Sequence, residues 1–358
     1  MRRVIVLGAT GSIGTTALEL ISRYPDEFQL VGVSAGSDRE KLREIARRFQ
    51  LPESAAALGA EASADLVRNT PADVVLNGIT GSAGLGATLA TLETDALLAL
   101  ANKESLIIGG ELVTSRAKEG QLVPVDSEHS AIAQALRSGE QQEVSRLILT
   151  ASGGPFRGRK RTDLESVTPS EALAHPTWNM GRVITTNSAT LVNKGLEVIE
   201  AHLLFGIPLA QIDVVVHPQS IVHSMVQFTD GSIIAQASPP DMTLPIALGI
   251  SWPHRLAGAM QPLDFAKSQS WTFEPLDEDA FGAVALARKV GELGSGYPAV
   301  FNAANEVAVD RFHDGSLSFL GITELIAAAV NAFTPLPEMT LEGVLGADAW
   351  ARNFASEF

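Results

Sequence analysis

The chain has 358 residues, 46% of them hydrophobic, so we expect two or three domains with substantial apolar cores. Its net charge of −15 argues against non-specific nucleic-acid binding, because phosphate backbones attract basic surfaces. The absence of cysteine excludes disulfides and thiolate metal sites, which leaves oxygen and nitrogen ligands for any metal.

The first 150 residues alternate short apolar runs with helical patterns. No apolar signal region precedes the first run, and no run is long enough to cross a membrane, so we expect a cytoplasmic protein without a membrane partner. Continuous apolar strands that alternate with helices indicate a parallel sheet covered on both faces. Strands are expected at 4–8, 28–36 and 72–79, helices at 13–23, 39–49 and 85–92, and further elements of unassigned type at 96–101 and 121–125.

Three glycines lie between the first expected strand and its helix. Gly8, Gly11 and Gly14 permit a tight turn and a close approach of the backbone to a pyrophosphate at the helix N-terminus. The alternative is a turn that needs glycine for steric reasons alone. We therefore predict nucleotide binding at this turn.

The end of the second expected strand bears on the choice of nucleotide. Ser34-Ala35-Gly36 lacks the acidic residue that would hold a free ribose hydroxyl, and Arg39 just beyond suits a 2′-phosphate. NADP is favoured over NAD, although Asp38 points the other way.

Two charged segments follow in the first 150 residues. Lys103, after a short apolar run, either binds a substrate oxygen or caps a helix end. Asp126 and Glu128 precede a helical pattern and either cap it or converge on a hard cation. With Glu197 they would form an all-carboxylate site for Mg²⁺ or Mn²⁺.

From about residue 145 the pattern changes to that of an α+β domain. Strands are expected within 145–156 and 211–238, with a hairpin turn at 229–231. Ser152, after the first of these strands, is a candidate phosphate ligand. His175 lies in the loop HPTWNMG and either binds an anion or belongs to a buried aromatic anchor.

The stretch 187–206, NSATLVNKGLEVIEAHLLFG, is predicted to be one helix. Ser188 is expected to cap its start, where free N–H groups favour an anion, and Lys194 adds a positive charge. Asn193 and Glu197, four residues apart, share a face. This arrangement suits a substrate with a phosphate at one end and metal-binding oxygens at the other. The alternative is an amphipathic helix with a surface polar cluster.

The last hundred residues divide into a linker and a helical region. Residues 251–278 read as a linker, and 279–358 as a small helical domain with breaks at 294–298 and 314–318. The polar cluster Asn302, Asn305 and Glu306 within it is expected to brace domains.

Eight segments together resemble one family. In chain order they are GATGSIG, ANKESL, PVDSEHSAI, LTASGGPF, HPTWNMG, NSATLVNKGLEVIEAHLLF, HPQSIVHSMVQF and NAANEVAV, and they resemble the 1-deoxy-D-xylulose 5-phosphate reductoisomerases. The resemblance implies a homodimer that converts 1-deoxy-D-xylulose 5-phosphate and NADPH to 2-C-methyl-D-erythritol 4-phosphate. It implies a Rossmann-like NADPH-binding domain at 1–145, an α+β catalytic domain with an open sheet at 146–250 and a flap near 175–182, and a C-terminal helical domain.

The same resemblance implies roles for individual residues. Asp126, Glu128 and Glu197 would hold Mg²⁺, Mn²⁺ or Co²⁺, and Trp178 and Met180 would belong to the flap. The reacting end of the substrate would meet Lys103, Ser127 and Glu128, and its phosphate end and hydroxyls would meet Ser152, His175, Ser188, Asn193 and Lys194. NADPH would contact Thr10, Gly11, Ser12, Ile13, Gly36, Asn102, Glu104 and Gly181.

One departure and two rival hypotheses accompany the resemblance. The family often has Lys or Arg, then Asn or Ser, directly after Ala-Gly at the second strand, whereas this chain has Ser37-Asp38-Arg39. A homoserine or semialdehyde dehydrogenase would share the glycine spacing but not the carboxylates and the Asn-Lys-Gly-x-Glu run, and the semialdehyde enzyme would need a nucleophilic Cys. A non-catalytic NADP sensor would have no use for three converging carboxylates.

Overall fold

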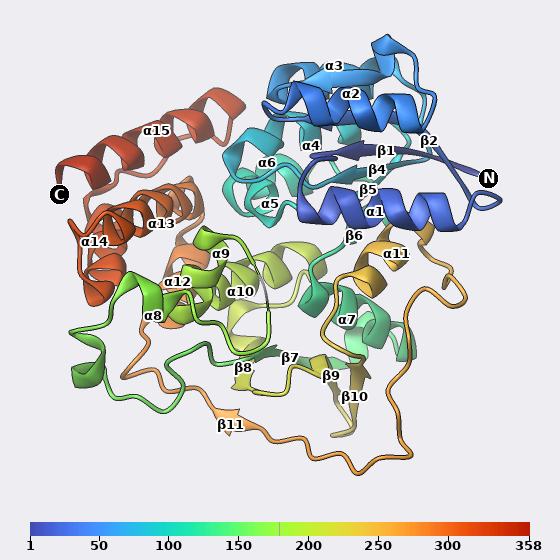
Figure 1. The fold of residues 1–358 in the computed structure, drawn as a ribbon. Helices are drawn as coiled ribbons and strands as arrows, with labels where there is room; N and C mark the ends of the chain where they lie inside the picture. The colour runs from blue at the N-terminus through green and yellow to red at the C-terminus, as the bar shows by residue number, and fades with distance from the viewer. Residues whose placement is uncertain (179) are drawn as a thin grey trace. The chain divides into compact units, whose positions relative to one another are not determined.

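The computed structural model describes residues 1–178 and 180–358 (Figure 1). Asn179, inside the predicted flap at 175–182, lies outside the described residues. The N-terminal part forms a six-stranded parallel sheet of order β3-β2-β1-β4-β5-β6, which confirms the predicted fold class. The order reverses between β1 and β4, where doubly wound sheets bind ligands. Its strands are β1 (Arg2–Leu7), β2 (Phe28–Ala35), β3 (Ala56–Leu58), β4 (Val74–Asn77), β5 (Leu97–Leu100) and β6 (Leu122–Pro124).

The residues of β1 point alternately into two apolar cores. Val4 and Val6 join the core under α1 (Ser12–Arg23), α2 (Arg39–Arg48) and α11 (Thr243–Ser251). Ile5 and Leu7 join the core under α3 (Ala60–Asn69) and α4 (Leu85–Leu92). All four side chains are fully buried, and each such burial stabilises the fold by about 1.5–3 kcal/mol. Helices on both faces therefore fix the end of β1, from which the glycine-rich turn emerges.

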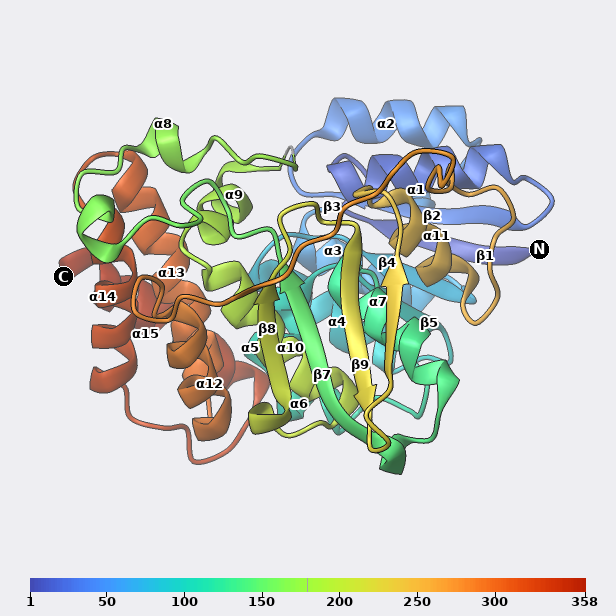
Figure 2. The same cartoon turned by 90° about the horizontal axis from the view of Figure 1, so that it is seen from below.

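The second sheet has five strands in the order β10-β9-β7-β8-β11. Only the pair β7 and β8 is parallel, and α10 (Val192–Phe205) lies behind these strands in Figure 2. The predicted hairpin is confirmed, because Gly231 N–H bonds to Phe228 O at 3.0 Å between β9 and β10. The strands are β7 (Val144–Ala151), β8 (Ile212–Val216), β9 (Val222–Phe228), β10 (Ile233–Ala237) and β11 (Glu274–Pro275).

The remaining helices are short in the first half and long at the C-terminus. The predicted helical C-terminal region is present, with the two expected breaks near 294–298 and 314–318 and a third, between α14 and α15, that was not predicted. The short helices are α5 (Lys103–Gly109), α6 (Glu111–Thr114), α7 (Ser127–Ala135), α8 (Pro169–Ala172) and α9 (Arg182–Ala189); the long ones are α12 (Ala283–Leu293), α13 (Tyr297–His313), α14 (Phe319–Ala332) and α15 (Leu341–Glu357). None of the helices in the described part of the chain is both long and apolar enough to span a membrane.

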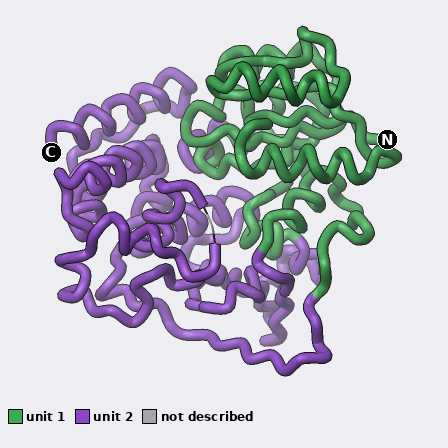
Figure 3. Tube along the Cα trace, in the orientation of Figure 1, with its two compact units in different colours: residues 1–106, 113–133, 241–262 green, residues 107–112, 134–240, 263–358 purple. Residues whose placement is uncertain are grey.

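The chain divides into two compact units, coloured separately in Figure 3. The first unit contains residues 1–106, 113–133 and 241–262, and the second contains 107–112, 134–240 and 263–358. Helix α11 thus belongs to the first unit although it follows four of the five strands of the second sheet in the sequence. The division into domains at 145, 250 and 278 remains a proposal.

The prediction of one helix over 187–206 is wrong. Helix α9 ends at Ala189 and α10 begins at Val192, because Leu191 takes a left-handed conformation with φ of 60°. Ser188 therefore lies in the last turn of α9 and does not cap the start of α10. A non-glycine residue in this conformation is strained, and such strain persists only where the surrounding structure imposes it.

Candidate active site

The glycines between β1 and α1 have two different physical roles. A Cβ at Gly8, where φ is +75°, would lie 2.6 Å from the carbonyl oxygen of Gly78, and one at Gly14 would lie 2.4 Å from that of Gly8. The turn itself therefore requires these two glycines. A Cβ at Gly11 would meet only one atom, at 3.4 Å, and one at Gly36 would meet none within 4 Å.

The open side of this turn fits a phosphate. Helix α1 starts after Gly11, and no side chain caps it. The first N–H groups of the helix point away from its body and have no intrahelical acceptor. Such a helix end favours an anion. Thr10, Ser12 and Ile13, predicted to contact NADPH, line the turn and the first residues of α1.

Asn102, another predicted cofactor residue, ties the loop after β4 to the start of α5. Its Nδ2 donates to Gly81 O at 3.0 Å and to Glu104 Oε2 at 3.2 Å, and its Oδ1 accepts the Ser105 N–H at 2.9 Å. The side chain is buried. It holds Glu104 in place at the carboxyl end of the sheet, where ligands bind in this type of fold.

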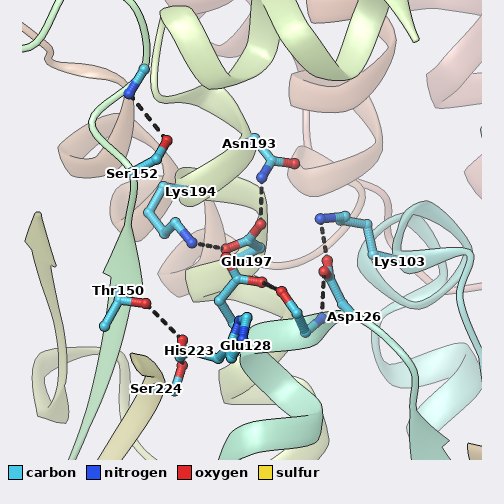
Figure 4. A network of polar contacts seen from close by, with 12 residues as sticks. Lys103, Asp126, Glu128, Thr150, Ser152, Asn193, Lys194, Glu197, His223 and Ser224 are labelled. Atoms are coloured by element: carbon cyan, nitrogen blue, oxygen red, sulfur yellow. Dashed lines mark hydrogen bonds and ion pairs between the residues drawn. The ribbon is translucent and has the colours of Figure 1, made fainter. Parts of the chain in front are cut away.

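The start of α7 carries two carboxylates of the first unit. Asp126 forms an ion pair with Lys103, the first residue of α5 (Figure 4). Glu128 Oε2 accepts the Ser127 hydroxyl at 2.6 Å, and the Ser127 N–H donates to Asp126 Oδ1 at 2.9 Å. Carboxylate oxygens of Asp126 and Glu128 lie within 4.8 Å of one another, a spacing that suits a shared hard cation.

Glu197, on α10, is a buried carboxylate of the second unit. Its side chain is 1% exposed, and Asn193 Nδ2 and Lys194 Nζ donate to its two different oxygens (Figure 4). Asn193 and Glu197 share a face of α10 as predicted. A buried charge pair of this kind contributes little net stability, but it holds each group in one position.

Ser152 and His175 meet near the end of β7. The distance from Ser152 Oγ to His175 Nε2 is 3.0 Å, and Gly154 N–H donates to the same oxygen at 3.2 Å. His175 Nδ1 accepts the N–H groups of Thr177 at 3.1 Å and Trp178 at 2.9 Å. The ring nitrogen Nδ1 must therefore be unprotonated, so Nε2 carries the hydrogen and donates to Ser152. The hydroxyl of Ser152 can then direct its own hydrogen to a ligand oxygen.

We expect the loop at His175 to lose order as the pH falls below about 6.5. Burial lowers the pKa of His175 below its ordinary value, and protonation at Nδ1 would abolish both backbone hydrogen bonds. The unfolded state binds the proton more tightly, so stability is complete above the ordinary pKa and decreases as the pH falls toward the lowered one. Tryptophan fluorescence against pH should report this transition through Trp178. A transition that survives unchanged in both His175→Gln and Trp178→Phe would contradict the assignment.

The polar cluster of α13 has a structural role. Asn302 donates to Glu306 at 3.0 Å, and Arg352 of α15 donates to Glu306 at 2.6 Å and to Asp348 at 2.7 Å. The two acidic partners raise the pKa of the Arg352 guanidinium further above its ordinary value despite its burial. These contacts join α13 to α15.

Lys41 is a candidate site residue that the sequence interpretation missed. Its Nζ donates to Thr10 O at 3.1 Å, which brings a cation from α2 to the glycine-rich turn. The signal in the sequence was a lysine on the first turn of the helix that follows Gly36.

Comparisons with known proteins point to one family. Family models described as 1-deoxy-D-xylulose 5-phosphate reductoisomerase match residues 4–57 and 51–110, and models of its C-terminal domains match 122–205 and 237–354. A reductoisomerase from Leifsonia xyli is 64% identical over 355 residues, covering 99% of this chain and 98% of its own. One from Pseudarthrobacter chlorophenolicus is 55% identical over 386 residues, covering 99% and 98%.

Solved structures of the same enzyme are also similar. That from Zymomonas mobilis in complex with NADPH has a TM-score of 0.92 at 40% identity, covering 99% of this chain and 98% of its own. Another, in complex with NADPH, fosmidomycin and magnesium, has a TM-score of 0.91 at 32% identity, covering 100% and 98%. The chain belongs to the 1-deoxy-D-xylulose 5-phosphate reductoisomerase family.

Proposed function

We propose that this protein catalyses the NADPH- and divalent-metal-dependent conversion of 1-deoxy-D-xylulose 5-phosphate to 2-C-methyl-D-erythritol 4-phosphate, a step of non-mevalonate isoprenoid synthesis. Family membership supports the reaction. The main structural support for this reaction in this protein is the buried carboxylate of Glu197, which accepts hydrogen bonds from Asn193 and Lys194 on the same helix.

The glycine-rich turn and the adjoining loops would hold NADPH. Gly11 and Gly36 leave the backbone open to a ligand, and the uncapped start of α1 suits the pyrophosphate. The contacts would come from Thr10, Gly11, Ser12, Ile13, Gly36, Asn102 and Glu104 in the first unit, and from Gly181 in the second.

Asp126, Glu128 and Glu197 would hold the metal, Mg²⁺ or Mn²⁺ with Co²⁺ as a third option. The donor set fits, because all three residues offer hard carboxylate oxygens. Asp126 and Glu197 each form an ion pair with a lysine ammonium group, so the surroundings of both carboxylates accommodate positive charge. When bound, the cation supplies Lewis acidity toward the ketone and hydroxyl oxygens of the substrate, and NADPH supplies the reducing equivalents.

The residues around these groups bind and orient the substrate. Lys103 and Ser127 would address the reacting hydroxy-ketone, since Lys103 is already held at Asp126 and Ser127 at Glu128. The phosphate end would be bound by Ser152, whose hydroxyl hydrogen can point to a ligand because His175 donates to its oxygen, together with His175, Ser188, Asn193 and Lys194. Holding the phosphate far from the reacting carbons makes binding energy available for orienting them.

The loop 175–182 would close over the substrate and exclude water. Trp178 is half-buried, and its ring centroid lies 6.5 Å from that of His223, edge to face. The carbonyl of Met180 accepts the Thr185 hydroxyl at 3.2 Å, which ties the loop to α9. Closure of such a loop can complete a site and shield the reaction from solvent.

A homodimer is part of the proposal, in keeping with the resemblance. The sheet of the second unit ends at β10, whose Ile233 and Ile234 are 49% and 37% exposed. An edge strand with exposed apolar residues is prone to associate. We expect Ile234→Asp to shift the protein from dimer to monomer in sedimentation velocity, whereas a wild-type monomer would contradict the proposal. The cytoplasmic location remains a prediction from the sequence.

The decisive experiment follows the absorbance of NADPH with 1-deoxy-D-xylulose 5-phosphate, first with Mg²⁺ and then with EDTA. NADPH absorbance is expected to fall with Mg²⁺, and EDTA should abolish this loss. EDTA binds the cation, and the carboxylates of the proposed site cannot supply its Lewis acidity by themselves. A protein that binds NADPH but oxidises it in neither condition would return the substrate assignment to the rival dehydrogenases. Oxidation that EDTA leaves unchanged would remove the metal from the proposal.

A further inference from the structure

Helix α2 is a local concentration of positive charge in an acidic protein. Its ten residues, REKLREIARR, include five basic and two acidic side chains, whereas the whole chain has a net charge of −15. A protein of that charge needs such a local field to attract an anionic ligand. The helix begins three residues after Gly36, beside the proposed NADPH site.

Asp38 does not have the role of an NAD-binding carboxylate. Its Oδ1 accepts the backbone N–H of Lys41 at 2.9 Å, so the side chain caps the start of α2. A carboxylate used in this way stabilises the helix by about 1 kcal/mol and is turned toward the helix end. The contradictory signal of Asp38 in the sequence therefore has a structural explanation.

Lys41 bridges the first turn of α2 and the glycine-rich turn. Its Nζ donates to the carbonyl oxygen of Thr10 at 3.1 Å. The end of β2 is joined to the same turn, because Ala9 N–H donates to Ser34 O at 2.7 Å. Lys41 therefore contacts a turn that is joined to β2, and β2 ends one residue before Gly36, where an added Cβ would meet no atom within 4 Å. An ammonium group has three hydrogens, so the bond to Thr10 leaves two for a further acceptor.

We propose that Lys41 is the residue by which this protein distinguishes NADPH from NADH, through binding of the 2′-phosphate by its ammonium group. The inference rests on the proposed function. It replaces the assignment of this role to Arg39, which is exposed on the same turn of α2. Lys41 would thus bind the 2′-phosphate in place of the basic residue that the family often has directly after Ala-Gly, a position occupied here by Ser37.

The experiment measures dissociation constants of NADPH and NADH separately, by cofactor fluorescence on the full-length protein, in the wild type and in three variants. Lys41→Gln is expected to weaken NADPH binding by about tenfold or more and to leave NADH binding unchanged, because only NADPH carries the extra phosphate. Arg43→Gln removes the same charge from a different face of α2 and should change either constant less than about twofold. Arg39→Gln should affect NADPH less than Lys41→Gln does.

The outcomes separate this inference from the proposed function. If Lys41→Gln weakens both nucleotides by the same factor, Lys41 only supports the turn, and the inference is wrong. A larger loss of NADPH affinity in Arg39→Gln than in Lys41→Gln would also overturn it. A folded wild-type protein that binds neither nucleotide would instead refute the proposed function itself.

Discussion

Glu197→Gln is expected to lower metal-dependent turnover by at least about a hundredfold while NADPH binding is retained. Replacing a residue that only orients a metal ligand already costs 10–100-fold, and Glu197 is proposed as a ligand itself. The substitution removes the negative charge that faces Lys194 inside the protein. In the wild type, Asn193 Nδ2 and Lys194 Nζ each donate to one carboxylate oxygen. In the variant, one of these two donors would face the new amide NH₂ group, which cannot accept its hydrogen bond.

The measurement is turnover against Mg²⁺ concentration, with NADPH binding and the thermal midpoint as controls. Glu197→Asp is the matched variant, because it keeps the charge and shortens the side chain by one methylene. We expect it to require more Mg²⁺ for half-maximal activity and to retain more activity than the Gln variant. Unchanged turnover in Glu197→Gln would remove Glu197 from the metal site.

Gly14→Ala is expected to destabilise the first unit by about 3 kcal/mol and to abolish NADPH binding. The new Cβ would lie 2.4 Å from Gly8 O, 2.6 Å from Ala9 Cα and 2.9 Å from Ala9 C. All three are backbone atoms of the turn, so no side-chain rotation can relieve the overlap. Helix α1 would have to move away from β1, and the core that contains Val4 and Val6 would open.

Gly11→Ala is the matched control for that substitution. Its Cβ would meet only Gly8 O, at 3.4 Å, so stability should stay within about 0.5 kcal/mol of the wild type. The methyl group would nevertheless occupy the open side of the turn and weaken NADPH binding. Urea unfolding and NADPH titration of both variants test the two effects. Equal stability of Gly14→Ala and the wild type would contradict the steric argument.

Local patterns predicted β1, β2 and β4 of the first sheet as strands and marked the segments of β5 and β6 as further elements. The helix expected at 85–92 has the observed bounds, and the strand expected at 28–36 differs from β2 by one residue. The segment that became β3 and α3, residues 56–69, was not predicted. It is rich in alanine and has neither the β-branched residues of a strand nor a wide apolar stripe.

The break at Leu191 shows the limit of periodicity in the candidate site. The polar and apolar positions of 187–206 repeat as in one helix, and no glycine, proline or asparagine marks residue 191. Its φ of 60° is not encoded by a local residue type, and segments distant in the sequence pack near this break. A Cβ on Gly154, for example, would lie 2.9 Å from Ser188 O, so the loop after β7 closely abuts the end of α9. The pairing of Asn193 with Glu197, by contrast, follows from helix geometry alone and was predicted.

The return of α11 to the first unit has a consequence for the order of events during protein synthesis. Ile246, Ala247 and Ile250 complete the core on one face of the first sheet, and a Cβ on Gly249 would lie 2.7 Å from Val125 Cγ2. A ribosome adds these residues only after it has made four of the five strands of the second sheet, β7 to β10. The part of this face that α11 covers therefore stays exposed while more than a hundred later residues emerge, although α1 and α2 already cover the rest, and it closes when residues 241–262 appear.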